Sequence, residues 1–252
     1  MHDPVNDFDM ISEGRRLVGE AAALGFPLRL LGGVALWVRS SEEAHGLFGR
    51  RYPDIDFVCH KKQSRELRKL LEELKYSPQR TFNAAHGAKR LLYHAAQGYQ
   101  VDVFLDVFEM CHRLDFRERL EVEDLTLPAA ELLLTKLQVV EVNRKDLSDV
   151  LMLLYDHGLA EDDGPRLLNT ARVATLCAAD WGLFTTITDN LAKLHDVVPE
   201  LVPDKVVASL LQGRVNEISQ CLEQAPKTFA WKLRAQVGRR KVWYELPEEV
   251  VR

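Results

Sequence analysis

The sequence lacks the cysteine pattern of a zinc site or a disulfide framework. Its four cysteines, at positions 59, 111, 177 and 221, are far apart and include no Cys-x-x-Cys pair, the spacing typical of structural zinc sites. It also lacks an apolar run of about 18 residues, the length that a membrane-spanning helix needs. The first ten residues, MHDPVNDFDM, are polar and acidic, unlike a targeting leader. We therefore expect a cytoplasmic protein without a membrane anchor.

A strong excess of positive charge is missing as well. The formal net charge is −5 and 28% of the residues are charged, so any nucleic-acid site must be local, because the whole molecule offers no basic field to phosphates. No internal repeat or low-complexity segment is evident. With 252 residues, 46% of them hydrophobic, the chain has the length of one large or two ordinary domains.

Two glycines and two aspartates between residues 30 and 60 carry the clearest chemical pattern. Residues 28–31 predict a buried strand, and Gly32 and Gly33 let the backbone turn tightly before a helix at 34–38. Amides at such a helix start can bind phosphate. In the alternating run 54–58, a strand would direct Asp54 and Asp56 to one face. Carboxylates beside phosphates are typical Mg²⁺ ligands.

A third carboxylate comes from a later alternating segment. Residues 89–95 and 99–105 predict two strands joined by a turn at Gln97-Gly98, which places Asp102 in the second strand. We expect Asp54, Asp56 and Asp102 to converge within reach of one cation. Asp106 shares the alternating face and is kept as an alternative third ligand.

The surrounding segments predict an α+β fold, a mixed sheet with flanking helices and a helical carboxyl-terminal region. Helices are expected at 8–24 and 61–75, where apolar residues recur at helical spacing. The intervening residues 39–53 predict either a loop or a loop with a short helix, leading into the strand at 54–58. Arg50 and Arg51 in this loop either meet a triphosphate or are simply solvated.

The composition changes at Pro128 to a helical pattern. Lys136 lies inside the apolar run 132–140, where an ammonium needs water or an anion nearby; we expect it to face the nucleotide cleft. The segment NRKDLSD at 143–149 interrupts the pattern. Asp146 and Asp149 in it form either a helix cap with its capping-box partner or part of the site.

Together, the segments LGGVAL, YPDIDF and LPAAELLLTKLQVVEVNRKDLSDVLML resemble the AbiEii-type nucleotidyltransferases of the polymerase-β-like superfamily, whose relatives include toxins of bacterial toxin–antitoxin and phage-defence systems. The resemblance spans residues 30–154 and implies a nucleotidyltransferase-type sheet. It implies transfer of a nucleoside monophosphate from an NTP to an acceptor hydroxyl. Two departures are Val34, where many members have a hydroxyl residue, and a longer connection from Gly33 to Asp54.

The resemblance also implies roles for individual residues. Asp54, Asp56 and Asp102 would be catalytic and would hold Mg²⁺, two ions in all. The nucleotide would meet seven further residues: Gly32, Gly33, Lys136, Arg144, Lys145, Asp146 and Asp149.

The chain beyond residue 158 carries no motif that identifies a function. Residues 162–165, DDGP, predict a linker, and apolar stripes at 167–194 and 206–222 predict helices. We therefore expect a catalytic domain at 1–127, helices completing the nucleotide site at 128–160 and a helical domain at 165–252. Basic and aromatic residues alternate in 227–244, which is either an RNA-binding segment or a closing helix with a solvated basic face.

Three functions remain open from the sequence. The first is a toxin-type nucleotidyltransferase with tRNA as acceptor and an antitoxin protein as partner. The second is an antibiotic-modifying nucleotidyltransferase with an aminoglycoside or lincosamide as the small-molecule acceptor. The third is a non-catalytic binding or antitoxin protein on the same fold.

Overall fold

The computed structural model describes residues 7–246, which form two compact units. The first unit contains residues up to Arg39 together with Arg50–Phe108 and Leu114–Pro128, and the second contains Ser40–Gly49, Glu109–Arg113 and the chain from Ala129 onward. Residues 1–6 of the polar amino-terminal stretch lie outside the described residues, as do 247–252. The domain limits expected from the sequence stay a prediction.

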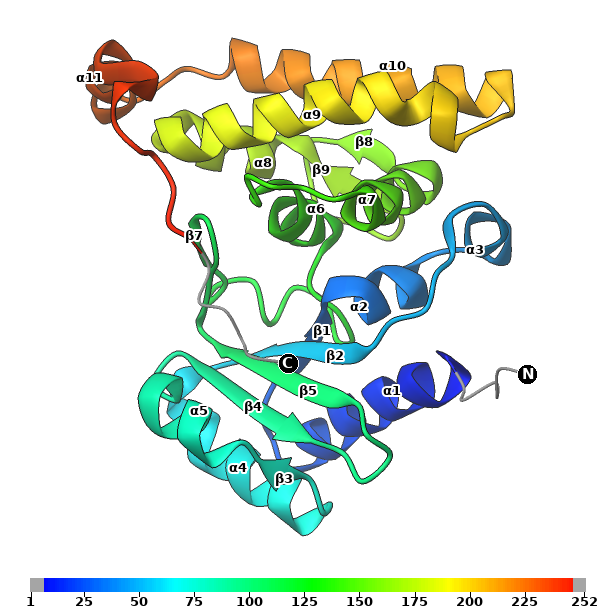
Figure 1. Ribbon diagram of the computed structural model, residues 1–252, viewed down its shortest axis with the longest axis vertical. Coiled ribbons are helices and arrows are strands. Elements are labelled where there is room, and N and C mark those ends of the chain that lie inside the picture. Colours follow the sequence, from blue (N-terminus) through cyan, green and yellow to red (C-terminus); the bar gives the residue numbers. More distant parts are fainter. Residues whose placement is uncertain (1–6, 247–252) are drawn as a thin grey trace. The chain divides into compact units, whose positions relative to one another are not determined.

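The first unit is built on a five-stranded mixed sheet with the order β1-β2-β5-β4-β3 (Figure 1). Strands β2 and β5 are parallel, and the other neighbouring pairs are antiparallel. A short segment continues the sheet beyond β1, because Leu30 donates to the carbonyl of Leu125 and accepts from the amide of Leu127. The strands are β1 (Leu28–Leu31), β2 (Asp54–Cys59), β3 (Ser77–Pro78), β4 (Arg90–His94) and β5 (Gln100–Leu105).

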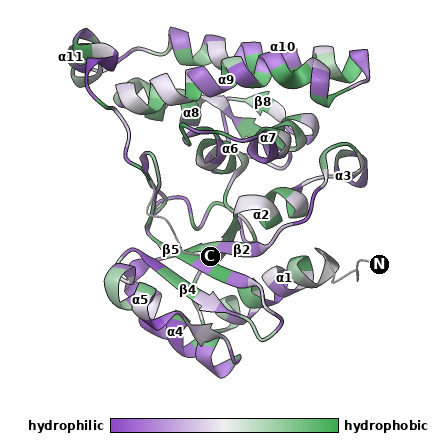
Figure 2. Ribbon diagram, viewed as in Figure 1, coloured by the Kyte–Doolittle hydropathy of each residue, from purple (hydrophilic) through white to green (hydrophobic). Residues whose placement is uncertain are grey.

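One face of this sheet is apolar and packs on helices. Leu30, Phe57 and Val103 are fully buried on it, and Gly14 of helix α1 lies directly against Leu30. Helix α4 contributes Leu67 and other buried leucines, while the rest of its surface is mostly hydrophilic (Figure 2). Since side chains alternate along a strand, the opposite face carries Asp54, Asp56 and Asp102.

Four α-helices flank the strands of the first unit: α1 (Asp7–Ala23), α2 (Gly32–Arg39), α4 (Ser64–Glu73) and α5 (Arg80–His86). The helices expected at 8–24, 34–38 and 61–75 are confirmed, the last after a 3₁₀ turn at Lys61–Gln63. Helix α5 was not predicted. The short strands β6 (Val107–Glu109) and β7 (Arg113–Asp115) form a separate pair.

The second unit is mainly helical. Its helices are α3 (Glu42–Phe48), α6 (Ala129–Leu137), α7 (Arg144–Asp156), α8 (Thr170–Ala179), α9 (Trp181–Leu201), α10 (Lys205–Gln224) and α11 (Phe229–Val237), with a 3₁₀ turn at Gly238–Arg240. Two strands, β8 (Gly158–Ala160) and β9 (Leu167–Asn169), pair in parallel. The expected linker DDGP is the loop between them, and the prediction of helix from 167 is wrong for β9.

Helix α3 is fixed by a residue far along the chain. Asp156, the last residue of α7, accepts hydrogen bonds from the backbone amide of Ser41 at 2.5 Å and from its hydroxyl at 2.9 Å. The same Ser41 hydroxyl accepts from the amide of Ala44 and caps the helix. A short helix in residues 39–53 was one of two predicted alternatives, and the structure shows it; its tertiary partner was not predicted.

Pro199 lies inside α9. A proline cannot donate to the carbonyl four residues earlier, which here belongs to His195. That carbonyl accepts a hydrogen bond of 3.2 Å from the Gln212 side chain on α10. The neighbouring helix thus supplies the missing donor.

The predicted fold class, a mixed sheet with flanking helices followed by a helical carboxyl-terminal region, is confirmed. Among residues 7–246, no helix combines the length and the apolar character needed to cross a membrane.

Candidate functional site

The Gly32-Gly33 pair lies at the junction of β1 and α2, as predicted. Gly32 has a φ of +67°, a conformation that glycine adopts without strain. A Cβ atom on Gly32 would lie 2.0 Å from Oδ2 of Asp56, and one on Gly33 would lie 2.1 Å from the Tyr52 ring. Both glycines are therefore required by close contacts, and the first contact brings a predicted carboxylate against the predicted glycine turn.

The predicted carboxylates share one face of the sheet. In the parallel pairing of β2 with β5, Asp56 is opposite Asp102 and Asp54 is opposite Gln100. Register partners on neighbouring strands are about 4.8 Å apart and point to the same face. Asp54 and Asp56 are half-buried, and Asp102 is only 6% exposed. The strand pairing thus brings all three to one patch of the sheet.

Asp102 has an arginine partner. Arg90 of β4 donates from Nε to Oδ1 at 2.7 Å and from Nη2 to Oδ2. This is a forked guanidinium–carboxylate pair, which is among the stronger hydrogen-bonded contacts in proteins. Arg90 therefore neutralises the buried carboxylate.

The donor chemistry of this face suits a hard cation, because Mg²⁺ prefers carboxylate oxygens and substrate phosphates. However, within the part of the chain that the structure describes, no three Asp, Glu, His or Cys side chains are grouped as a metal-binding cluster. The type and placement of Asp54 and Asp56 fit such an ion, whereas both oxygens of Asp102 are bound to Arg90. The expected convergence of all three on one cation stays a prediction.

Asp106, the alternative third ligand, lies just beyond the carboxyl end of β5. The register aligns Leu105, the residue before it, with Cys59 at the end of β2. Asp106 is four residues past Asp102, a distance of roughly 13 Å at the usual rise of a strand. Its φ of +64° ends the alternation that had placed it on the same face. Its carboxylate accepts from the Lys61 amide at 3.0 Å and lies 3.4 Å from His60 Nδ1. The structure thus contradicts Asp106 as an alternative to Asp102.

Val34 and Arg50 lie near the glycine turn, and both are engaged in contacts within the protein. Val34 is 1% exposed and contacts Gly14 of α1, so in this chain the position contributes to the core. Arg50 places its guanidinium 4.4 Å from the centre of the Tyr52 ring. That ring lies under Gly33, and Arg50 is thereby held near the turn by a cation–π contact.

In the second unit, Lys136 on α6 meets two of the predicted acids on α7. Its Nζ lies 2.9 Å from Asp146 Oδ1 and 2.7 Å from Asp149 Oδ2. Asp149 is fully buried. Burial lowers the pKa of Lys136, but the charges of Asp149 and Asp146 outweigh it, and the net pKa is raised. The anion that this lysine needs is thus supplied by the protein itself.

The remaining residues of the NRKDLSD segment begin helix α7. Asn143 caps it, accepting from the amides of Lys145 and Asp146, so the capping-box alternative for Asp146 and Asp149 is wrong. Arg144 is exposed and pairs with Glu200 at 3.3 Å. Lys145 is exposed. Whether these residues serve the nucleotide, as the resemblance implies, stays a prediction.

Some residues of the basic and aromatic segment near the carboxyl end are engaged in packing, although Phe229 is 77% exposed and Lys232 is exposed. Trp231 packs edge-on against Phe184, and Trp243 donates to the Thr186 hydroxyl at 3.1 Å. Arg234 donates to the carbonyls of Gly238 and Lys241. These contacts favour the interpretation of a closing helix over that of a stacking platform for RNA.

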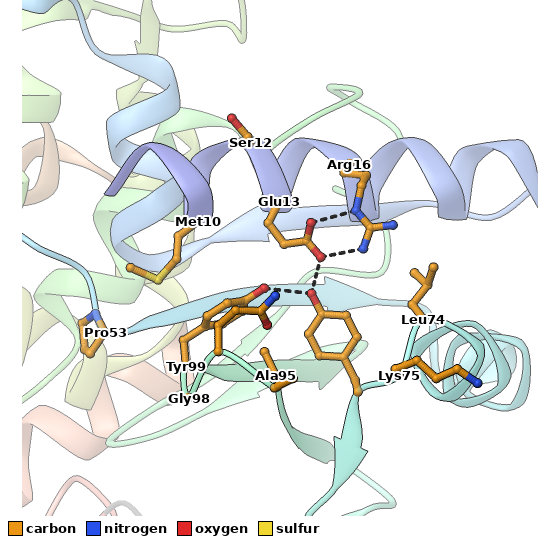
Figure 3. A pocket seen from close by; sticks show the side chains of 13 residues that line it. Met10, Ser12, Glu13, Arg16, Pro53, Leu74, Lys75, Ala95, Gly98 and Tyr99 are labelled. Carbon is orange, nitrogen blue, oxygen red and sulfur yellow. Dashed lines mark hydrogen bonds and ion pairs between the residues drawn. The ribbon is translucent and has the colours of Figure 1, made fainter. Parts of the chain in front are cut away.

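A cavity of about 700 Å³ lies on the other side of the sheet, against α1 (Figure 3). Glu13 forms a fork with Arg16 and accepts from the hydroxyl of Tyr76, which lies 3.1 Å from that of Tyr99. Arg16 lowers the pKa of Glu13, while burial raises that of Tyr76. Arg16 and Glu13 neutralise each other's charge, and the hydrogen bond from Tyr76 to Glu13 joins α1 to the opposite wall of the cavity.

Sequence reasoning missed Arg90 and Tyr52. The signal for Arg90 was present, because a hairpin turn at Gln97-Gly98 sets the register of β4 against β5 and puts Arg90 opposite Phe104, on the Asp102 face. Tyr52 gave no such signal, since its contact with Gly33 depends on the path of a long connection.

No family model matches the chain, and no curated protein matches it. Among solved structures, the chain is similar to one described as an antigenic nucleotidyltransferase-like protein from Paracoccidioides brasiliensis. The similarity has a TM-score of 0.45 and 15% sequence identity, and it covers 90% of this chain and 98% of that one.

Proposed function

We propose that the chain is a metal-dependent nucleotidyltransferase of the AbiEii type. The supporting observation is the contact between Gly32 and the carboxylate of Asp56, with Asp102 directly opposite Asp56 in the parallel register. This arrangement joins a phosphate-binding backbone turn to acidic side chains, and phosphoryl transfer requires mainly such positioning and charge neutralisation.

In the proposed reaction, an acceptor hydroxyl attacks the α-phosphorus of an NTP. A bond from the acceptor oxygen to this phosphorus forms, the bond to the bridging oxygen of the β-phosphate breaks, and pyrophosphate leaves. Asp102 takes the hydroxyl proton. Asp54 and Asp56, joined by Asp102, would hold Mg²⁺, which would withdraw charge from the phosphates when bound. Backbone amides at the start of α2 bind phosphate oxygens.

Lys136, Arg144, Lys145, Asp146 and Asp149 are proposed to serve the nucleotide on the strength of the family resemblance. The acceptor is proposed to be tRNA, with an antitoxin protein as partner. A small-molecule acceptor such as an aminoglycoside is the alternative that the same chemistry allows.

The decisive experiment incubates the protein with each α-labelled NTP and Mg²⁺, in parallel with total tRNA and with an aminoglycoside. We expect label to move to tRNA with the wild type and to fall to background with Asp56→Asn, because the substitution removes ligand charge while keeping the shape. Asp196→Asn is the matched control, since that side chain is 83% exposed. Transfer to the drug alone would identify the small-molecule enzyme. No transfer from any NTP by folded protein would contradict the proposal.

A further inference from the structure

Arg90 is fixed on two sides where it binds Asp102. Its guanidinium lies 4.8 Å from the centre of the Phe104 ring and 5.5 Å from that of Phe82 on α5. The Asn83 side chain joins α5 to β4 by donating to the Leu92 carbonyl at 3.0 Å and accepting from the Leu92 amide at 2.7 Å. Helix α5 thus holds Arg90 in line with the carboxylate.

The fork uses both oxygens of Asp102. A cation that takes Asp102 as a ligand needs at least one of these oxygens, and it repels the guanidinium charge beside it. Arg90 and a divalent cation therefore compete for the same carboxylate. The Arg90 side chain is 18% exposed, and the Asp102 side chain alone is 9% exposed, so the arginine is the partner with more access to solvent.

We propose that Arg90 occupies Asp102 in the protein without a bound cation and must release it before Asp102 can bind a divalent cation. This inference rests on the proposed function and assigns Arg90 as a positioning residue that acts through Asp102. The cation site then has two carboxylates, Asp54 and Asp56, at rest and gains the third only when the fork opens.

The test measures binding of Mn²⁺ alone, by calorimetry and by electron paramagnetic resonance, without nucleotide. Arg90→Met keeps an apolar stem between the two rings and removes the competitor. We expect Mn²⁺ affinity to rise about ten- to a hundredfold, the range set by the loss of hydrogen bonds to a charged group. Arg90→Lys, which keeps the charge but loses the fork, should give a smaller rise. In an Asp102→Asn background, Arg90→Met should have no effect. Unchanged or weaker Mn²⁺ binding by folded Arg90→Met would overturn the inference.

A measurement on the wild type keeps the inference testable if Arg90→Met does not fold. The Nε–H resonance of Arg90, assigned by its loss in Arg90→Lys, should shift when Mg²⁺ is added. A resonance that stays in place at saturating Mg²⁺ would overturn the inference.

The outcomes separate this inference from the proposed function. If the wild type binds Mn²⁺ through Asp56, as shown by its loss in Asp56→Asn, and Arg90→Met changes nothing, only the competition is wrong. If neither the wild type nor Arg90→Met binds Mn²⁺, the proposed cation site and the competition are both wrong.

Discussion

Gly32 has no room for a side chain, because a Cβ atom there would lie 2.0 Å from Oδ2 of Asp56. Gly32→Ala should therefore displace the carboxylate and strain a backbone with a φ of +67°. We expect the free energy of unfolding to fall by roughly 1–3 kcal/mol and Mn²⁺ binding to weaken, as measured by urea denaturation and calorimetry.

Gly19→Ala is the matched control for Gly32→Ala, since Gly19 lies inside α1 with nothing within 4 Å of its Cβ position. That change should stabilise the protein by roughly 0.5–1 kcal/mol. If Gly32→Ala were as stable as Gly19→Ala and bound Mn²⁺ normally, the close approach of Gly32 to Asp56 would have no functional role.

Lys136→Met should destabilise the protein strongly, because it leaves the fully buried Asp149 without the ammonium 2.7 Å away. Removing one partner of a buried pair costs about 3–5 kcal/mol. Since the pKa of Lys136 is raised, its contribution is present at neutral pH and is lost only as the pH rises above the ordinary lysine value of 10.5. Urea denaturation at pH 7 measures the loss.

Two comparisons make the Lys136 experiment specific. Lys69→Met, at a side chain that is 77% exposed, should change the stability by no more than about 0.5 kcal/mol. Adding Asp149→Asn to Lys136→Met should recover part of the lost stability, because the unpaired charge is removed. A loss below about 1 kcal/mol in Lys136→Met would show that the pair is not a structural one. NTP binding by this variant is informative only in protein that is folded.

At the scale of elements, the sequence predicted those features of the fold that depend on local patterns. The alternation around Asp56 and Asp102 identified β2 and β5, and the glycine pair marked the start of α2. These features could be predicted because the periodicity of a strand or a helix is visible in a short stretch of sequence. Helix α5 was missed since Arg80–His86 has no periodic apolar pattern and is fixed by the pairing of Asn83 with Leu92. The pairing of Asp102 with Arg90 likewise depends on tertiary structure.

In the candidate site, too, the features that depend on local sequence patterns were predicted and the tertiary contacts were not. The sequence identified the acids that share a face, but not that Asp102 is held by Arg90 or that Lys136 is held by two acids. A long-range ion pair depends on distances between elements, which periodicity does not contain. Asp106 was misplaced because a positive φ at the strand end is invisible in an alternating pattern.

The segment containing α11 offers a test of an RNA acceptor. Arg239 is committed to Asp189 at 2.7 Å, whereas Arg240 and Lys241 are exposed. If the acceptor is RNA bound by this segment, Arg240→Gln with Lys241→Gln should leave NTP binding intact and reduce the salt dependence of tRNA binding by about one unit of slope for each lost phosphate contact.

The control for the α11 test neutralises Arg65 and Lys69, two exposed residues on α4, which gives the same change in net charge. Filter binding of labelled tRNA across salt concentrations measures both slopes. Equal slopes for the α11 variant, the α4 variant and the wild type would assign the basic segment to packing alone.

At the scale of the whole molecule, the chain passes between its two units at residues 39/40, 49/50, 108/109, 113/114 and 128/129. The connection from Gly33 to Asp54 contains α3, and α3 belongs to the second unit. This connection therefore has a structural use, because it contributes a helix to the second unit.

The anchoring of α3 by Asp156 has a consequence for synthesis. The hydrogen bond joins residues 115 positions apart, and a ribosome adds about 5–20 residues per second. Helix α3 therefore spends roughly 6–23 s on the growing chain before its anchor exists, and a helix of 7 residues is not stable by itself in water. During this interval we expect Ser40–Gly49 to be accessible to chaperones and proteases.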